Sequence, residues 1–375
     1  MEWYDRHAKH KELVLGMSQK KPNFAMKMKT TKIFKIGILT FVALLGGNNG
    51  TMAQETDGQK AHPTFGLEYT GEVQTDFKKL KSVNLLELGA QLPLTSKLSV
   101  ELGSISVLTT DEAILTNCLQ NFSSIDAPNI PFALTTAGLA WQINEHHHVF
   151  AGIHRIDDNY FCSDMLGLFT HSSCGAFPTI TANYDIAAYP VSALGIHYGY
   201  TKDAFSLETS LYNGVGYKDF SKRDNVFRIC PESDGVFLMA QGEYDKNATR
   251  AYVGGSVLYS DLHATVPKRM RPVVWAYAEQ DITERFSVLA GYSHAFGNDI
   301  TCHDFYLVCG RYAYKKAEFG VFSSYTRIDE KDEWATELTC NIQFNKIFSL
   351  QPALHFANTD GKNKCVGLVR VGVKI

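Results

Sequence analysis

Residues 205–213 read FSLETSLYN, and this short stretch separates the possible fold classes. Its two sets of alternate residues differ in character: Phe205, Leu207, Thr209 and Leu211 form one set, and Ser206, Glu208, Ser210 and Tyr212 the other. Alternation with a period of two and one apolar face is typical of a half-buried β-strand. The stretch therefore predicts a strand whose two faces meet different surroundings.

The same alternation recurs through the chain, for example in FGLEYTGEV (65–73), LELGAQL (86–92), TELTCNIQF (336–344) and the last seven residues. About sixteen such segments are predicted: 64–75, 83–93, 97–109, 134–144, 147–157, 190–201, 204–214, 235–245, 248–260, 272–282, 285–296, 303–314, 317–328, 334–344, 348–358 and 365–375. We therefore expect an all-β protein with antiparallel strands.

The connections between these segments also alternate. One set consists of tight turns such as LTSK, TKDA and ITER, whereas the other set contains long inserts at about 110–133 and 158–189. A soluble sandwich or barrel would turn its apolar face inward, whereas a transmembrane barrel turns it towards lipid around a polar lumen. The even strand number, the uneven loops and the Tyr and Phe residues near strand ends favour a transmembrane antiparallel β-barrel. About sixteen strands leave room for an aqueous channel.

The N-terminal part reads as a targeting segment. Basic residues precede an apolar run of about ten residues at 36–45, and TMA at 51–53 suits a cleavage site, so residues 1–53 are predicted to be a signal peptide. An uncleaved membrane anchor is the alternative, and a true start at Met26 or Met28 would make the residues before it a spurious extension. Residues 54–375 would then form the barrel, in the outer membrane of a Gram-negative bacterium, with lipids and the barrel assembly machinery as partners.

The composition excludes several functions. The formal net charge is -3 and no basic run follows the N-terminus, so we expect no nucleic-acid partner. EHHH at 145–148 resembles a metal cluster but falls in a tight turn, and we expect neither a metal nor a cofactor there. No motif indicates an enzyme. The eight cysteines leave disulfides open as braces for the long loops.

The longest insert contains FTHSSCGAFPTITANYDIAAYP (169–190) and becomes the third outer loop if the N-terminus is periplasmic. If this loop extended into water, its aromatic side chains would be exposed. We therefore expect it to fold inward against the barrel wall, where they are buried. LFTHSSCG, FPTITANY, AYPVSALG and SLYNGVGY resemble the central region of the carbohydrate-selective porin (OprB) family. That resemblance implies passive diffusion of sugars through the outer membrane.

A sugar path needs aromatic faces for pyranose rings and polar groups for hydroxyls. In the third loop we expect the path or its constriction to be formed by Arg155, Asp157, Asp158, Tyr160, Phe161, Asp164, Phe169, Phe177, Asn183 and Tyr184. On the strands we expect lumen-facing side chains at Glu68, Glu72, Glu87, Gln91, Glu101, Glu208, Glu337 and Arg370. Packing between loop and wall is the alternative role for the aromatic residues, and a solvated pore wall is the alternative for the carboxylates.

Two alternatives to a sugar porin stay open. Lys218, Lys222, Arg223 and Arg228 in the fourth outer loop favour a general or weakly anion-selective porin, although nearby aspartates offset them. The other alternative is a barrel that serves as an adhesin or a hydrolase.

Overall fold

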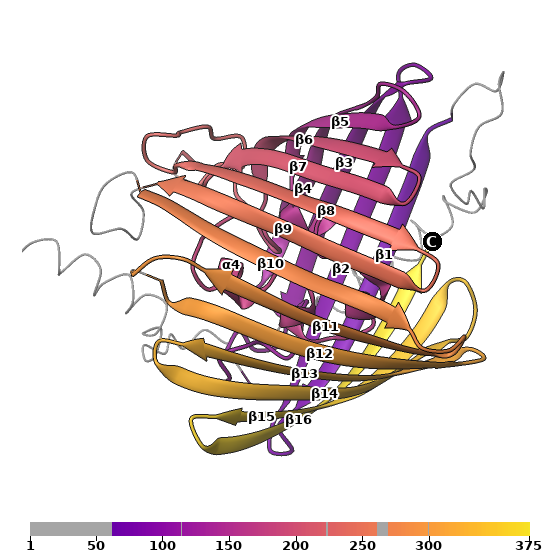
Figure 1. Cartoon of the computed structure of the whole chain (residues 1–375), viewed down its shortest axis with the longest axis vertical. Coiled ribbons are helices and arrows are strands. Elements are labelled where there is room, and N and C mark those ends of the chain that lie inside the picture. The colour runs from indigo at the N-terminus through magenta and orange to yellow at the C-terminus, as the bar shows by residue number, and fades with distance from the viewer. Residues whose placement is uncertain (1–61, 114, 223, 261–268, 299) are drawn as a thin grey trace, which may run out of the picture. The chain divides into compact units, whose positions relative to one another are not determined.

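The computed structural model describes residues 62–113, 115–222, 224–260, 269–298 and 300–375. The chain divides into two units, Met1–Asp57 and Gly58–Ile375, and the expected signal peptide at 1–53 lies outside the described residues. The second unit is a closed barrel of sixteen antiparallel strands (Figure 1). The expected fold class and strand number are confirmed.

Each strand pairs with its neighbours in the sequence, and β1 pairs with β16 to close the ring. The strands are β1 (Thr64–Thr75), β2 (Leu80–Pro93), β3 (Leu98–Thr109), β4 (Ile130–Gln142), β5 (His147–His154), β6 (Ala193–Lys202), β7 (Phe205–Asn213), β8 (Val236–Lys246), β9 (Thr249–Ser260), β10 (Arg269–Asp281), β11 (Phe286–Ala295), β12 (Cys302–Tyr314), β13 (Ala317–Ile328), β14 (Lys331–Gln343), β15 (Phe348–Thr359) and β16 (Lys362–Lys374). Closure matters because an unpaired strand edge would expose backbone donors and acceptors.

The three longest connections that the structure describes leave the barrel at the same end, at 110–129, 155–192 and 214–235. The opposite end has tight turns, for which residues with positive φ such as Asp203 (54°) and Asn247 (58°) provide the left-handed backbone. The long connection at 155–192, here called segment L3, contains four short helices: η1 (Ile156–Asp158), α3 (Asp164–Gly167), η2 (Ser172–Cys174) and α4 (Pro178–Thr181). No helix in the described part of the chain is long and apolar enough to cross a bilayer.

Alternation along the strands separates an exposed apolar face from a covered face. In β7 the side chains of Phe205, Leu207 and Leu211 are exposed by 60%, 41% and 46%. The residues on either side of Leu211, Ser210 and Tyr212, are buried. A free-standing sheet has no reason to expose its apolar side, so this face is the one that an apolar solvent would cover. The buried face is the interior of the barrel.

Candidate functional site

Segment L3 packs against the interior face of β8 to β13. Phe177 is fully buried, with its ring centroid 5.1 Å from that of Phe305 and 5.8 Å from that of Tyr277. Phe161 lies 4.7 Å from Phe177 and 5.1 Å from Trp275, measured between ring centroids. These rings join apolar side chains of L3 and of the strands into one continuous core.

This core corrects one expectation about the interior. The alternation predicted a polar lumen, but β10, β12 and β13 turn Trp275, Tyr277, Phe305, Leu307 and Phe322 inward, and all are buried. An apolar interior face is stable there because L3 covers it and removes it from water.

Carboxylates on the interior wall bind the backbone of L3. Glu337 of β14 accepts hydrogen bonds from Thr170 N and Thr170 Oγ1, both at 3.0 Å, and from His171 N at 3.0 Å. Glu279 of β10 accepts hydrogen bonds from Ser163 Oγ and from Met165 N. Charge-assisted hydrogen bonds away from water are among the stronger polar contacts. They fix L3 at two places along its length.

The other residues expected in L3 also attach it to the strands. Tyr160 is buried and donates from its hydroxyl to Ser210 Oγ at 2.8 Å, and the hydroxyl of the buried Tyr184 donates to a backbone carbonyl of β10. Asn183 donates to Cys302 O at 2.8 Å and accepts from Cys302 N at 2.9 Å. Phe169 is also buried, 5.6 Å from Phe322 between ring centroids. In this conformation, therefore, the aromatic residues of L3 pack loop against wall.

The root of L3 holds a charged group of residues. Arg155 Nη2 lies 3.0 Å from Asp158 Oδ1 and 3.8 Å from Glu87 Oε1 on β2. Asp157 accepts a hydrogen bond from Tyr189 N at 2.6 Å, and burial raises the pKa of its carboxyl. Asp164 in the first turn of α3 stays exposed. Arg155, Asp157 and Asp158 thus come together, and Asp164 lies apart from them.

The side chains expected to face the lumen fall into two groups. Glu72 is buried in the seam between β1 and β16, where Arg370 Nη2 lies 2.6 Å from its Oε1. Like Glu337, this pair is covered. The second group keeps some exposure: Glu68 near Lys374, Glu87 near Arg155, Gln91 and Glu101 within 3.3 Å of each other, and Glu208 beside His197.

Sequence reasoning missed the part played by the long connection 110–129. Glu333 of β14 is fully buried and accepts hydrogen bonds from Leu119 N at 2.7 Å and Gln120 N at 2.8 Å. Gln120 also accepts a hydrogen bond from Ser173 Oγ of L3 at 2.8 Å. Glu333 lies four residues before Glu337 on the same strand, so both side chains point to the same face. This strand phase could have predicted that Glu333 faces the interior.

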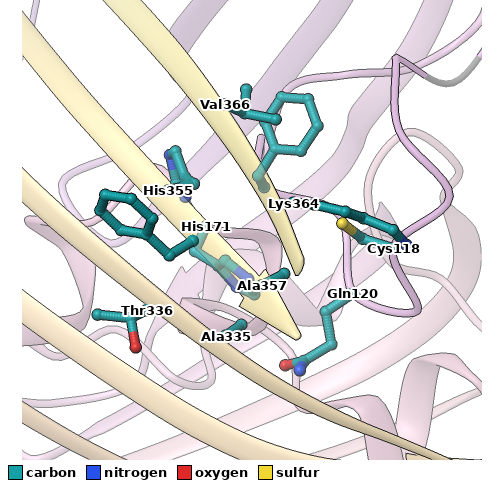
Figure 2. Close-up of a pocket in the computed structure, with 11 residues that line it drawn as sticks. Cys118, Gln120, His171, Ala335, Thr336, His355, Ala357, Lys364 and Val366 are labelled. Atoms are coloured by element: carbon teal, nitrogen blue, oxygen red, sulfur yellow. The ribbon is translucent and has the colours of Figure 1, made fainter. Parts of the chain in front are cut away.

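Figure 2 shows where these two connections meet the wall. Cys118 and Gln120 from one connection, His171 from L3, His355 of β15 and Val366 of β16 are among the residues that line a hollow with a volume of only about 10 Å³. Such a space holds at most about one water molecule. It is a packing interface between the loops and the wall.

A larger hollow lies beside the root of L3. It has a volume of about 220 Å³ and is lined by Asp158, Asn159, Cys162, Glu208, Gln241, Glu243 and Tyr252. Carboxylates and amides dominate this lining, and these groups bind hydroxyls or cations. We call it the β7–β9 cavity.

All eight cysteines are free thiols in the structure, so the possible disulfide braces are absent. The loops are held by hydrogen bonds and apolar packing instead.

Comparison with solved structures finds this fold in several porins. The high-pH structure of Pseudomonas putida OprB matches with a TM-score of 0.70 at 14% sequence identity, over 84% of this chain and 94% of that chain. An anion-selective porin from Comamonas acidovorans matches with a TM-score of 0.57 at 10% identity, over 84% and 99% of the two chains.

A mutant of the Rh. blastica porin matches with a TM-score of 0.57 at 10% identity, over 84% of this chain and 100% of that chain. No protein-family model matches the chain, and no curated protein matches its sequence. At such identities the likeness concerns the fold alone, and the fold is a porin-type barrel.

Proposed function

We propose that this protein is an outer-membrane porin of a Gram-negative bacterium that lets small hydrophilic solutes diffuse passively. The single observation that carries the proposal is the closed sixteen-strand barrel with an exposed apolar face and a partly exposed polar interior. A bilayer offers no hydrogen bonds to a sheet edge, so closure and an apolar exterior suit a membrane.

The solute path would run along the part of the interior that L3 leaves exposed. Glu68, Glu87, Gln91 and Glu101 on β1 to β3 retain exposure, whereas L3 covers much of the interior of β8 to β13 and leaves the β7–β9 cavity beside its root. L3 would act as the constriction, and its root would place Arg155, paired with Asp158 and Glu87, on the wall of the path. Charged side chains that line a pore tune which solutes pass.

Sugars are the proposed solute class. The β7–β9 cavity supports this, because the acidic and amide groups in its lining suit hydroxyls. The resemblance of the L3 sequence to carbohydrate-selective porins agrees with this chemistry. Weak contacts of this kind slow a sugar without trapping it.

A general or anion-selective porin is the second candidate, and the basic residues of the fourth outer loop, in the connection 214–235, favour it. Arg228 lies 3.2 Å from Asp234 and donates to Ser233 Oγ at 2.7 Å, so its charge is offset locally. Of the other residues in that group, Arg223 lies outside the described residues.

Single-channel recording of the purified protein in planar bilayers separates these functions. A sugar porin shows stable conductance in KCl that falls as glucose or maltose is added, and Asn159→Ala in the β7–β9 cavity weakens this block. Glu284→Ala, in the exposed tight turn between β10 and β11, is the control and keeps the block. Conductance without block, with an anion-shifted reversal potential, would favour the second candidate. A barrel without conductance would contradict both and point to an adhesin or a hydrolase.

A further inference from the structure

Three side chains with metal-binding atoms converge on the interior face of β5, β6 and β7. They are His148 of β5, His197 of β6 and Glu208 of β7, and one ligand atom from each lies within 4.8 Å of the other two. His197 Nε2 is 2.9 Å and His148 Nε2 is 3.9 Å from Glu208 Oε2. Two imidazoles and a carboxylate form a ligand set that transition metals use.

Strand register explains why the three side chains meet. His148 is paired with Gly199 on β6, and Gly199 is paired with Glu208 on β7, so these residues form one cross-strand row. Gly199 leaves the middle of the row open. A Cβ at Gly199 would lie 2.7 Å from Glu208 Oε2 and would also collide with the His148 ring. The glycine is therefore required for both side chains to lean over it.

His197 is oriented by a second contact. Its ring is 2% exposed, and its Nδ1 lies 2.8 Å from Ser210 Oγ, which also accepts a hydrogen bond from Tyr160 of L3. Nε2 is thereby directed at Glu208, yet neither His197 Nε2 nor Glu208 Oε2 forms a hydrogen bond of proper geometry. Buried polar atoms without a well-formed hydrogen bond are rare and need a reason, and a shared cation between His197 Nε2 and Glu208 Oε2 would supply one.

We propose that His148, His197 and Glu208 bind a divalent transition-metal ion of the Zn²⁺ or Co²⁺ type. Imidazole nitrogen suits these ions, whereas Mg²⁺ and Ca²⁺ prefer ligand sets made of oxygen. The contact between His197 Nδ1 and Ser210 is the kind of outer contact that orients a metal-binding histidine. Three protein ligands leave at least one coordination position free.

The free position has room on the side of the β7–β9 cavity, because Glu208 is part of its lining. Water or an oxygen of a passing solute would complete the coordination there. The proposal concerns binding by the folded chain and does not depend on the transport function.

The EHHH motif contributes only His148 to this site. His147 Nδ1 lies 2.7 Å from Tyr198 Oη, and His146 Nδ1 lies 3.0 Å from Thr201 O. These two neighbours are directed to other partners. The turn alone thus gave no metal site, and β6 and β7 supply the other two ligands.

The test uses the full chain without a polyhistidine tag, folded in detergent, stripped of metal with EDTA and titrated with Co²⁺. We expect one Co²⁺ per chain, with visible d–d absorption that Zn²⁺ abolishes by displacement. His197→Ala and Glu208→Gln should each lower the affinity at least tenfold, and Gly199→Ala should do so by steric exclusion. His146→Ala is the matched control and should leave affinity and stoichiometry unchanged.

Heat-modifiable mobility in gels verifies that each variant forms a barrel. One folded variant among His197→Ala, Glu208→Gln and Gly199→Ala is sufficient for the test. Absence of stoichiometric Co²⁺ binding by the wild type would overturn the proposal and leave a plain His197–Glu208 ion pair. The proposal would also be overturned if folded His197→Ala and Glu208→Gln bound Co²⁺ with wild-type affinity. The same holds if His146→Ala were the only variant that lost binding.

Discussion

Replacing Glu337 with alanine should release the middle of segment L3 from the barrel wall. The carboxylate is fully buried and accepts hydrogen bonds from two backbone amides and one hydroxyl, at Thr170 and His171. A hydrogen bond to a charged group contributes about 1.5–3 kcal/mol. The three bonds share one acceptor group and are not additive, so we take a total of about 4 kcal/mol.

That loss has a measurable consequence for local opening. Each 1.4 kcal/mol is a factor of about ten, so about 4 kcal/mol raises the equilibrium constant for undocking roughly a thousandfold. The amides of Thr170 and His171 exchange hydrogen only when L3 leaves the wall, because Glu337 occupies both. Their exchange rates should rise by up to the same factor.

Hydrogen–deuterium exchange with mass spectrometry measures this directly on peptides from L3. Glu101→Ala is the matched control, since Glu101 also lies on the interior face but contacts Gln91 on the neighbouring strand. In the Glu101→Ala variant, the L3 peptides should exchange hydrogen at the wild-type rate. If Glu337→Ala forms a barrel and its L3 peptides exchange at the wild-type rate, then Glu337 does not hold the loop and the reasoning fails.

Three further predictions concern the same interior. Phe177→Ala should destabilise the docked loop by about 3–5 kcal/mol through cavity formation, seen as increased channel noise, with Phe177→Leu closer to wild type. Arg370→Ala leaves the Glu72 carboxylate buried without its cation and should cost about 3–5 kcal/mol; an unchanged urea midpoint would contradict this. Burial lowers the pKa of His171 to about 3, so acidification favours the undocked, protonated form. The rise in undocking on acidification from pH 7 to pH 5 should therefore be larger for the wild type than for a His171→Gln channel, and equal pH dependence of the two channels would contradict this.

The strands were predictable because their signal is local. Side chains of a strand point alternately to opposite faces, so a strand between two different environments shows a period of two in residue character. FSLETSLYN and TELTCNIQF show this period. Boundaries agreed to within a few residues, as for β13, expected and observed at 317–328. β5 ends earlier than expected, at His154, because Ile156 already begins η1.

The site was only partly predictable. Glu337 was assigned to the interior from its strand phase, but its bonds to Thr170 and His171 join residues far apart in the chain. The proposed metal site shows the same limit. The EHHH motif gave no metal site by itself, and only the strand register places Gly199 and Glu208 beside His148.

The sequence by itself determined an antiparallel barrel of about sixteen strands, one apolar face and a long third connection rich in aromatic residues. The tertiary structure decided what lies inside. It placed L3 on an apolar interior wall and brought buried carboxylates onto loop amides. The physical reason is that a strand's pattern records only whether its neighbour is apolar or polar. Which segment supplies that neighbour depends on contacts between residues that the chain separates by more than a hundred positions, such as Thr170 and Glu337.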